Sequence, residues 1–354
     1  MYGAEEKKNV GIQVAARKGK AKEIQTDLSL LQCESVATQC GEWIGSYQRK
    51  ANQGNVYWTY DKLKDGVLTS RNCVISWLME RKLIASNRLC PRCDSVMKLV
   101  ECDDRSDGCK WECRKQIGGK RHKIELSIRK GSWFEGSNLT LEEVLKLTYW
   151  WCRDVKQETM RFEVDVSGNT VVDWDRFCRE ICELNYFECR EKIGGPGVRV
   201  QIDESKFGKR KYHRGHRVEG QWVFGGIEEG SRKSFMFAVE DRSERTLLPI
   251  IETVIEKGTT IISDCWKAYL NLEKHGYKHL QVNHSVEFVN KNGDHTNKIE
   301  GHWRQAKVKF PPFGIRKYMF SSYLAEFLWR YENKGKDLFE VFLEDAKKIY
   351  GNFE

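Results

Sequence analysis

The sequence has 354 residues, with 60 Lys and Arg against 51 Asp and Glu, a formal net charge of +9 and a pI near 8.8. This length allows two or three domains, and the moderate basic excess suits a polyanionic partner without requiring one. The sequence has no apolar run of membrane-spanning length and no signal-peptide pattern, so we expect a soluble protein with no membrane partner. Its 13 cysteines, an odd number, favour reduced thiols over a disulfide framework.

The structure of the first two segments is predicted from their composition and hydrophobic periodicity. Residues 1–55 are polar without clear periodicity, which is typical of a flexible arm. The alternative is short strands or binding motifs at three similar stretches, GIQVA, EIQTD and VATQC. Residues 56–87 are predicted as a helical segment, with helix over 58–85. Its apolar face consists of Val74, Ile75, Trp77, Leu78 and Leu83.

Residues 88–133 form a Cys-rich unit that opens with the metal-knuckle spacing Cys90-Pro-Arg-Cys93. A closed tetrahedral zinc site needs two further ligands. The candidates are Cys102, Cys109, Cys113 and His122.

Spacing helps to choose between these candidates. Cys109 and Cys113 lie in a run that reads as a strand, where positions four apart are separated by about 13 Å, so both cannot bind one ion. Cys113 and His122 stand on either side of a turn-prone segment, as in the second half of a zinc ribbon. We predict structural Zn²⁺ on Cys90, Cys93, Cys113 and His122, with Cys109 replacing Cys113 or His122 as the alternative.

This ribbon has no open coordination position, so we assign it no catalysis. It presents basic residues such as Arg114, Lys120 and Arg121, which suit DNA phosphates. The alternative is a unit that only holds the fold together.

Residues 134–193 are predicted as helical. Thr140 followed by Glu143 is a capping-box signature, and a Gly-containing turn at 167–169 precedes a second helical run. Helix, turn and helix are the pattern of a helix-turn-helix DNA-binding region, and an ordinary helical pair is the alternative.

The pattern changes to strands after GGPG at 194–197, which marks a domain boundary. The strand candidates are VRVQID (198–203), GQWVFGGIEE, SFMFAVED, TTIISD (259–264) and YKHLQV (277–282). LLPIIETVIEKG, DHTNKIEGHWRQAKVKF (294–310) and the stretch 318–350 read as helices. We therefore expect an α/β fold with a mixed sheet.

Acidic residues stand at informative places in these elements. Asp203 closes the first strand, Asp264 ends the strand TTIISD, and Glu300 lies in the helix that follows. A solvated strand end or a helix cap is the alternative for either aspartate alone. Two strand carboxylates and a helical carboxylate are the oxygen ligands that two Mg²⁺ (or Mn²⁺) ions need for phosphoryl transfer.

Six stretches give the chain a resemblance to a known family. They are IRKGSWFEGSNLTLEEVL (128–145), QIDESKFGKRKYHRGHR (201–217), QWVFGGIE (221–228), IISDCWKAY (261–269), VNHSVEFVN (282–290) and DHTNKIEGHWRQAKVKF (294–310). The chain resembles the Merlin family of cut-and-paste DNA transposases and their bacterial insertion-sequence relatives, and CPRC fits that family's zinc ribbon. The resemblance covers about 60 to 354.

The resemblance implies an RNase H-like catalytic core at 194–313, a mixed sheet with flanking helices, and C-terminal helices at 314–354 packing on it. It also implies a DDE-type metal site whose first two aspartates are Asp203 and Asp264. The third residue is Asn in some relatives and Glu in others, and this chain has both Asn297 and Glu300.

Helical geometry places both candidates together. Ile299, Trp303, Ala306 and Phe310 form an apolar stripe, and Asn297, Glu300, Arg304 and Lys307 form the adjacent polar stripe. Only Glu300 adds negative charge to a site that must hold two dications. We therefore predict Glu300 as the ligand, with Asn297 orienting water or binding a phosphate oxygen.

Basic side chains near this site are candidates for DNA contacts. They are Lys206, Lys209, Arg210, Lys211, Arg214 and Arg217 in one dense run, and Arg304 and Lys307 in the helix. Solvated surfaces are the alternative for both groups. His284 and His295 are weaker candidates for assisting at the scissile phosphate, and Trp266 could stack on a base or belong to the core.

The prediction is a DDE transposase that binds terminal inverted repeats, cleaves double-stranded DNA at transposon ends and joins the 3′-hydroxyl ends to target DNA. Two ends must be joined, so we expect a homodimer, nuclear in a eukaryotic host and otherwise cytoplasmic. The alternatives are a transposase-derived sequence-specific DNA-binding protein without strand transfer and a metal-dependent nuclease.

Overall fold

The computed structural model describes residues 57–188, 190–208, 220–282, 296–311 and 315–353. The predicted arm at 1–55 lies outside these ranges. Within them, the helices are too short or too polar for a membrane crossing. The strands form a three-stranded, a five-stranded and a two-stranded sheet.

The first described segment contains two short helices where the sequence predicted one over 58–85. Helix α3 spans Tyr60–Gly66 and helix α4 spans Arg71–Glu80. The Ser70 hydroxyl accepts a hydrogen bond from the backbone N–H of Cys73 at 3.2 Å, so it caps a new helix. Of the apolar face that we predicted, Val74, Ile75, Trp77 and Leu78 lie on α4, and Leu83 lies just after the end of that helix.

The Cys-rich unit folds as three antiparallel strands in the order β1-β2-β3. The strands are β1 Lys98–Glu101, β2 Cys109–Ile117 and β3 Lys120–Ser127. Gly118 and Gly119 form the two-residue turn between β2 and β3, with φ of +55° and +79°. Such a turn needs positive φ at both positions, which explains the paired glycines.

The next region is helical, as predicted, and contains three helices. They are α5 Leu141–Cys152, α6 Gln157–Val164 and α7 Gly168–Glu188. The predicted capping box is confirmed: Thr140 caps the N–H of Glu143, whose carboxylate accepts from the N–H of Thr140. Helices α6 and α7 form a pair, but one face of α7 packs against α10 and α11. The helix-turn-helix function therefore stays a prediction.

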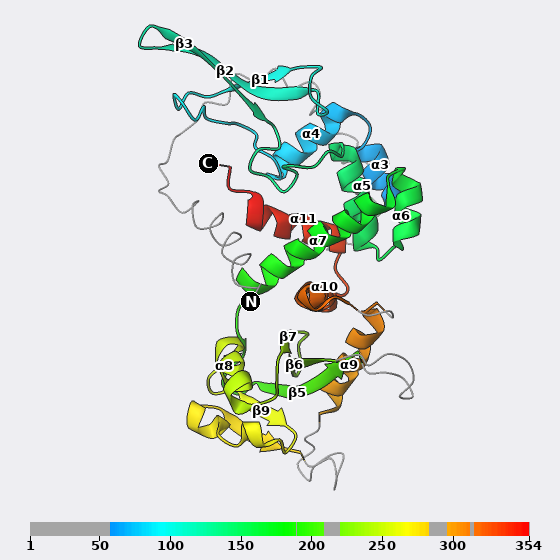
Figure 1. The fold of residues 1–354 in the computed structure, drawn as a ribbon, viewed down its shortest axis with the longest axis vertical. Coiled ribbons are helices and arrows are strands. Elements are labelled where there is room, and N and C mark those ends of the chain that lie inside the picture. The colour runs from blue at the N-terminus through cyan, green and yellow to red at the C-terminus, as the bar shows by residue number, and fades with distance from the viewer. Residues whose placement is uncertain (1–56, 189, 209–219, 283–295, 312–314, 354) are drawn as a thin grey trace. The chain divides into compact units, whose positions relative to one another are not determined.

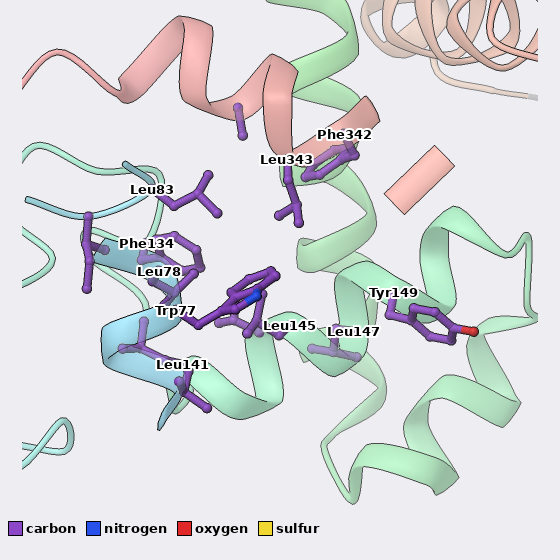
Figure 2. Packing of buried hydrophobic residues seen from close by; sticks show 14 of the residues in the cluster. Trp77, Leu78, Leu83, Phe134, Leu141, Leu145, Leu147, Tyr149, Phe342 and Leu343 are labelled. Carbon is purple, nitrogen blue, oxygen red and sulfur yellow. The ribbon is translucent and has the colours of Figure 1, made fainter. Parts of the chain in front are cut away.

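The two C-terminal helices divide between two cores. Helix α10 spans Phe320–Glu332 and follows the short helix η5 Lys317–Met319, and α11 spans Leu338–Tyr350. Helix α10 contributes Leu324 and Leu328 to the core under the five-stranded sheet, and Ala325 and Trp329 to the core of the helical region. Helix α11 instead packs on α5 and α7, where Phe342 joins the buried hydrophobic cluster drawn in Figure 2. We expected both helices on the catalytic core, but the apolar face of α11 matches the helical region.

The five-stranded sheet has the order β10-β9-β5-β6-β7 and is seen in the lower part of Figure 1. Its strands are β5 Arg199–Phe207, β6 Gln221–Glu228, β7 Ser234–Val239, β9 Thr260–Ser263 and β10 Lys278–Gln281. Strands β5, β6 and β7 pair antiparallel, whereas β5, β9 and β10 pair parallel. This is a mixed sheet of the kind expected for an RNase H-like core. The pair β4 Ile193–Gly194 and β8 Ile255–Glu256 adds a small parallel sheet.

Helices cover both faces of the sheet. Helix α8 Glu244–Val254 and the turns η3 Lys267–Tyr269 and η4 Leu272–His275 pack on the face that holds Val200 and Ile202. Helix α9 Asn297–Lys309 and helix α10 pack on the other face. Because side chains alternate along a strand, Asp203 belongs to the α9 face and its neighbour Glu204 to the α8 face.

Candidate active site and zinc centre

Asp203 and Asp264 lie on neighbouring parallel strands at the same level. Strand β5 pairs with β9 through Arg199 with Thr260 and Gln201 with Ile262. Two residues beyond the last of these pairs come Asp203 on one strand and Asp264 at the end of the other. The two predicted aspartates are therefore brought side by side by strand register.

Asp203 is the most enclosed carboxylate of the three. Its Oδ2 accepts a hydrogen bond from Nε1 of Trp303 at 3.0 Å, and strand β5 continues past it to Phe207 rather than ending there as predicted. The pKa of Asp203 is raised to about 6, chiefly by burial and also by the negative charges of Asp264 and Glu300, while its hydrogen bonds oppose this rise. The three predicted ligands therefore act electrostatically on one another.

Every fourth residue of helix α9 contacts every second residue of strand β5. Ile299 meets Gln201, Trp303 meets Asp203, and Lys307 donates to the Ser205 hydroxyl at 2.6 Å. Four helical residues advance about 6.0 Å and two strand residues about 6.6 Å, so side chains at these spacings stay opposite one another. This match fixes the position of Glu300 along the strand.

The sequence analysis did not identify Gln201, whose side chain caps the N-terminus of α9. Its Oε1 accepts from the backbone N–H groups of Lys298 and Ile299, each at 3.1 Å, and Gln201 is fully buried. The local cap residue, Thr296, makes no side-chain cap bond to the helix. A strand residue thus satisfies the first N–H groups of α9. The sequence signal was an amide between two apolar residues of an alternating strand, on the same face as Asp203.

Gly225 was also missed. It pairs with Asp203 across β5 and β6. A Cβ atom at Gly225 would lie 2.5 Å from the Trp303 ring and 2.9 Å from the carbonyl oxygen of Phe235. The absence of a side chain therefore makes room for the indole that holds Asp203.

Asp264 is held by the turn that follows β9. Its Oδ1 accepts from the backbone N–H of Trp266 at 3.0 Å, and its carbonyl accepts from the Ser263 hydroxyl at 2.8 Å. The Ser263 hydroxyl is also 2.8 Å from Nε2 of His279 on β10. Asp264 therefore has a defined orientation at the sheet edge.

Glu300 and Asn297 lie on the same exposed stripe of α9 as Arg304 and Lys307, as predicted. The adjacent apolar stripe is buried, with Ile299 at 0%, Trp303 at 4% and Ala306 at 0% exposure. The Thr296 hydroxyl donates to Glu300 at 3.4 Å. The helix therefore presents Glu300 to solvent beside the two aspartates, and Asn297 lies at its first residue.

The three carboxylates supply only oxygen donors, which suits Mg²⁺ or Mn²⁺ rather than zinc. They do not form a closed cage. Within the described residues, the one group of three or more acidic, Cys or His ligands whose atoms all lie within 4.8 Å of one another is the Cys and His cluster. The oxygen atoms of the three carboxylates are therefore less closely gathered than the ligand atoms of that cluster.

That cluster consists of the four residues predicted for zinc, Cys90, Cys93, Cys113 and His122. Sγ of Cys93 lies 3.6 Å from Sγ of Cys113, and Nε2 of His122 lies 3.4 Å from Cys113 and 3.6 Å from Cys90. Tetrahedral zinc, with Zn–S near 2.3 Å and Zn–N near 2.0 Å, separates its ligands by about 3.5–3.8 Å. The donor set therefore fits a structural Zn²⁺.

Cys109 lies outside this group, although it was the alternative ligand. Cys113 and His122 are diagonal neighbours on one face of the β2–β3 hairpin, since Cys113 pairs with Ile124 and Lys115 with His122. Burial raises the pKa of the Cys109 thiol to about 11, as for a small buried side chain.

The remaining predicted residues are only partly described. Lys206 lies on β5 with its ammonium 5.4 Å from the ring centre of Trp222. Lys209, Arg210, Lys211, Arg214 and Arg217, together with His284 and His295, lie outside the described residues. Trp266 is half-buried: its Nε1 donates to the Arg242 carbonyl at 2.9 Å and its ring packs on the Arg242 guanidinium. These contacts favour the core alternative for Trp266.

Glu204 follows Asp203 on β5 and faces the other layer of the fold, where its side chain is only 2% exposed. Burial raises the pKa of Glu204 to about 7, against the opposing effect of the hydrogen bond from the Tyr269 hydroxyl. The sequence analysis did not use the fact that a second acidic residue, Glu204, directly follows Asp203 in the strand.

Comparisons with known proteins concern the region of the chain that contains the three carboxylates. The sequence profile of the ISXO2-like transposase domain matches residues 193–332, which contain all three carboxylates. A protein of Haemophilus influenzae (strain ATCC 51907 / DSM 11121 / KW20 / Rd), described as an uncharacterized transposase-like protein, is 32% identical over 102 residues, 28% of this chain and 82% of that protein.

Two solved structures show a weaker likeness. The catalytic core domain of BIV integrase is 15% identical, with coverage of 43% of this chain and 97% of that one and a TM-score of 0.29. The Mos1 strand transfer complex is 12% identical, with coverage of 60% and 79% and a TM-score of 0.22. Likeness at this level places no constraint on the site. The matched ISXO2-like domain and the relative covered over most of its length show that the chain belongs to the DDE-type insertion-sequence transposases.

Proposed function

We propose that this protein is a DNA transposase that cleaves DNA at transposon ends and joins the freed 3′-hydroxyl ends to target DNA. The observation that carries the proposal is the placement of Asp203, Asp264 and Glu300 by one strand register and one helix, inside the region that matches the transposase domain. A protein that only bound DNA would not need three carboxylates facing one another. The Merlin subgroup is proposed with it, on the six matching stretches.

In this proposal the three carboxylates hold two Mg²⁺ or Mn²⁺ ions. Such ions, when bound, activate the attacking oxygen and stabilise the leaving oxygen of an in-line displacement. Asp203 is held by Trp303 and Asp264 by the backbone N–H of Trp266, so neither has to be ordered when DNA arrives. Glu300 is the exposed member, and Asn297 beside it orients water or a phosphate oxygen.

The chain's basic residues would hold the DNA. Arg304 and Lys307 extend from Glu300 along the exposed stripe of α9, where phosphates flanking the scissile bond would lie. The run 209–217, which follows β5, would add phosphate contacts. Terminal inverted repeats would be recognised by the ribbon and the 134–193 helices, with Zn²⁺ holding the ribbon's shape.

Strand transfer with paired end oligonucleotides in Mg²⁺ tests the proposal. We expect cleaved ends joined to target DNA by the full chain, and loss of both products in Asp264→Ala. The control is Glu252→Gln, a partly buried acidic residue of α8 that pairs with His275 away from the site, and it should retain both products. Cleavage without joining would indicate a nuclease, and tight binding with neither product would indicate a DNA-binding protein; either result overturns the proposal.

The number of chains in the complex is part of the same proposal. Two ends are joined in one event, so we expect two chains in each complex with paired end DNA. Sedimentation of the complex should give two chains for two ends. One chain for two ends would contradict the dimer while leaving the chemistry intact.

A further inference from the structure

Glu204 is a buried carboxylate next to the candidate site that the proposed chemistry does not use. Two groups stabilise its burial. The hydroxyl of Tyr269, itself fully buried, donates a hydrogen bond to one carboxylate oxygen, and Nη1 of Arg242 lies 4.0 Å from the other. A buried carboxylate is costly unless it is paired and hydrogen-bonded, so these contacts constrain both partners as well as Glu204.

Both partners belong to the structure around Asp264. Tyr269 ends the short helix η3, which begins directly after Trp266. The Arg242 guanidinium lies between two indole rings, 4.2 Å from the ring centre of Trp222 and 4.4 Å from that of Trp266. Nε1 of Trp266 also donates to the Arg242 carbonyl at 2.9 Å. Trp266 is thus held through its ring and its N–H by the residue that pairs with Glu204.

Trp266 completes the connection to the site. Its backbone N–H donates to Oδ1 of Asp264 at 3.0 Å, so the orientation of this carboxylate depends on where Trp266 is held. A continuous series of contacts therefore runs from Glu204 through Tyr269 and Arg242 to the turn at 264–269 and back to Asp264.

We propose that Glu204 is a positioning residue that fixes the 264–269 turn, so that the Asp264 carboxylate faces Asp203. Two adjacent residues of β5 then have separate tasks on the two faces of the sheet. Asp203 binds a cation on the α9 face, and Glu204 anchors the second aspartate from the α8 face. This inference rests on the proposed function, because it takes Asp264 as a cation ligand.

Three variants of the full chain isolate this role. Tyr269→Phe removes one hydroxyl, Glu204→Gln keeps an acceptor for that hydroxyl but removes the charge opposite Arg242, and Glu204→Ala removes both contacts. Glu252→Gln on the same face of the sheet is the matched control. Thermal unfolding of each variant shows whether it folds, and Tyr269→Phe carries the test if Glu204→Ala does not.

The first measurement is Mn²⁺ binding to the DNA-free chain. The electron paramagnetic resonance signal of free Mn²⁺ reports how much of the ion remains unbound. Loss of a group that orients a metal ligand typically weakens affinity by about 10- to 100-fold, and we expect this range for Glu204→Ala and Tyr269→Phe, with a smaller loss for Glu204→Gln. Hydrogen exchange should be faster at the backbone amides of 264–269.

The second measurement is the Mg²⁺ dependence of cleavage. The half-maximal Mg²⁺ concentration should rise in the variants, while the rate at saturating Mg²⁺ stays near that of the unaltered chain. Damage to the fold would lower the saturated rate instead.

Asp264→Ala separates the two proposals. If it leaves Mn²⁺ affinity unchanged, the metal assignment itself fails. If Asp264→Ala weakens Mn²⁺ binding and the Glu204 and Tyr269 variants do not, only the positioning role of Glu204 is overturned.

Discussion

The two candidate metal sites of this chain differ in how their ligands are assembled. In the ribbon, the four sulfur and nitrogen atoms of Cys90, Cys93, Cys113 and His122 lie within 4.8 Å of one another. In the sheet region, Asp203, Asp264 and Glu300 influence one another electrostatically without gathering into such a group. A structural ion needs a closed cage, whereas ions that act on a phosphate need open positions.

The supporting residues differ in the same way. The ribbon ligands lie on a knuckle and a hairpin, both local in sequence, so the cluster depends on few long-range contacts. The carboxylates depend on partners from distant segments, because Trp303, Gln201 and Gly225 come from three different elements. A local site tolerates changes elsewhere in the chain, but a site assembled between elements does not. The predictions below test this contrast, from the largest expected effect to the smallest.

Removing a zinc ligand should have the largest effect. Cys113→Ser leaves three ligands for an ion whose binding is coupled to folding, so we expect a loss of about 5 kcal/mol or more in ribbon stability. Zinc content by mass spectrometry and hydrogen exchange in β2 and β3 measure it. Cys109→Ser is the matched control and should keep one zinc per chain. Loss of zinc in Cys109→Ser but not in Cys113→Ser would reverse the ligand assignment.

The choice between Glu300 and Asn297 comes next. Glu300→Gln removes one negative charge from the cation site, and we expect cleavage to fall by about 10³-fold, equivalent to about 4 kcal/mol in the barrier. Asn297→Ala should cost less than about 10-fold, because an amide only orients a ligand. Single-turnover cleavage of end DNA compares the two. Full activity in Glu300→Gln with loss in Asn297→Ala would show that the amide is the ligand.

Gly225→Ala should damage the acidic site without touching a ligand. The added methyl group meets the Trp303 ring and a backbone oxygen, so we expect about 1–3 kcal/mol of destabilisation and slower cleavage, because Trp303 moves from Asp203. Gly301→Ala on α9 is the control, since a Cβ there meets nothing within 4 Å. Urea unfolding of both proteins provides the comparison. Equal stability of the two variants would show that the space between Gly225 and the Trp303 ring does not restrict the residue at position 225.

The smallest effect is expected at the exposed tip of the β2–β3 hairpin. Lys120→Ala with Arg121→Ala removes two charges that we propose to contact DNA phosphates. The slope of log affinity against log salt should become shallower by about 1.8, without change in zinc content. Fluorescence anisotropy with end DNA at several salt concentrations measures it. Lys64→Ala on α3 is the control, and an unchanged slope in the double variant would exclude the hairpin from the DNA interface.

Local patterns predicted much of the molecule. The strand candidates between 198 and 282 all appear, the capping box at Thr140 begins a helix, and the stripes of α9 are buried and exposed as the helical period requires. The knuckle spacing identified two members of the Cys and His cluster, and the hairpin with its paired glycines brings the other two together. These features succeed because each depends on residues within one or two turns of structure.

The sequence by itself therefore determined the types of the elements and the chemistry of their exposed faces. Only the tertiary structure decided that Gln201 caps α9, that Gly225 makes room for Trp303, that Glu204 is anchored beside Asp264 and that α11 packs on the helical region. The physical reason is common to all four. A periodic pattern reports which side of an element is buried, but the partner on that side comes from a segment far along the chain.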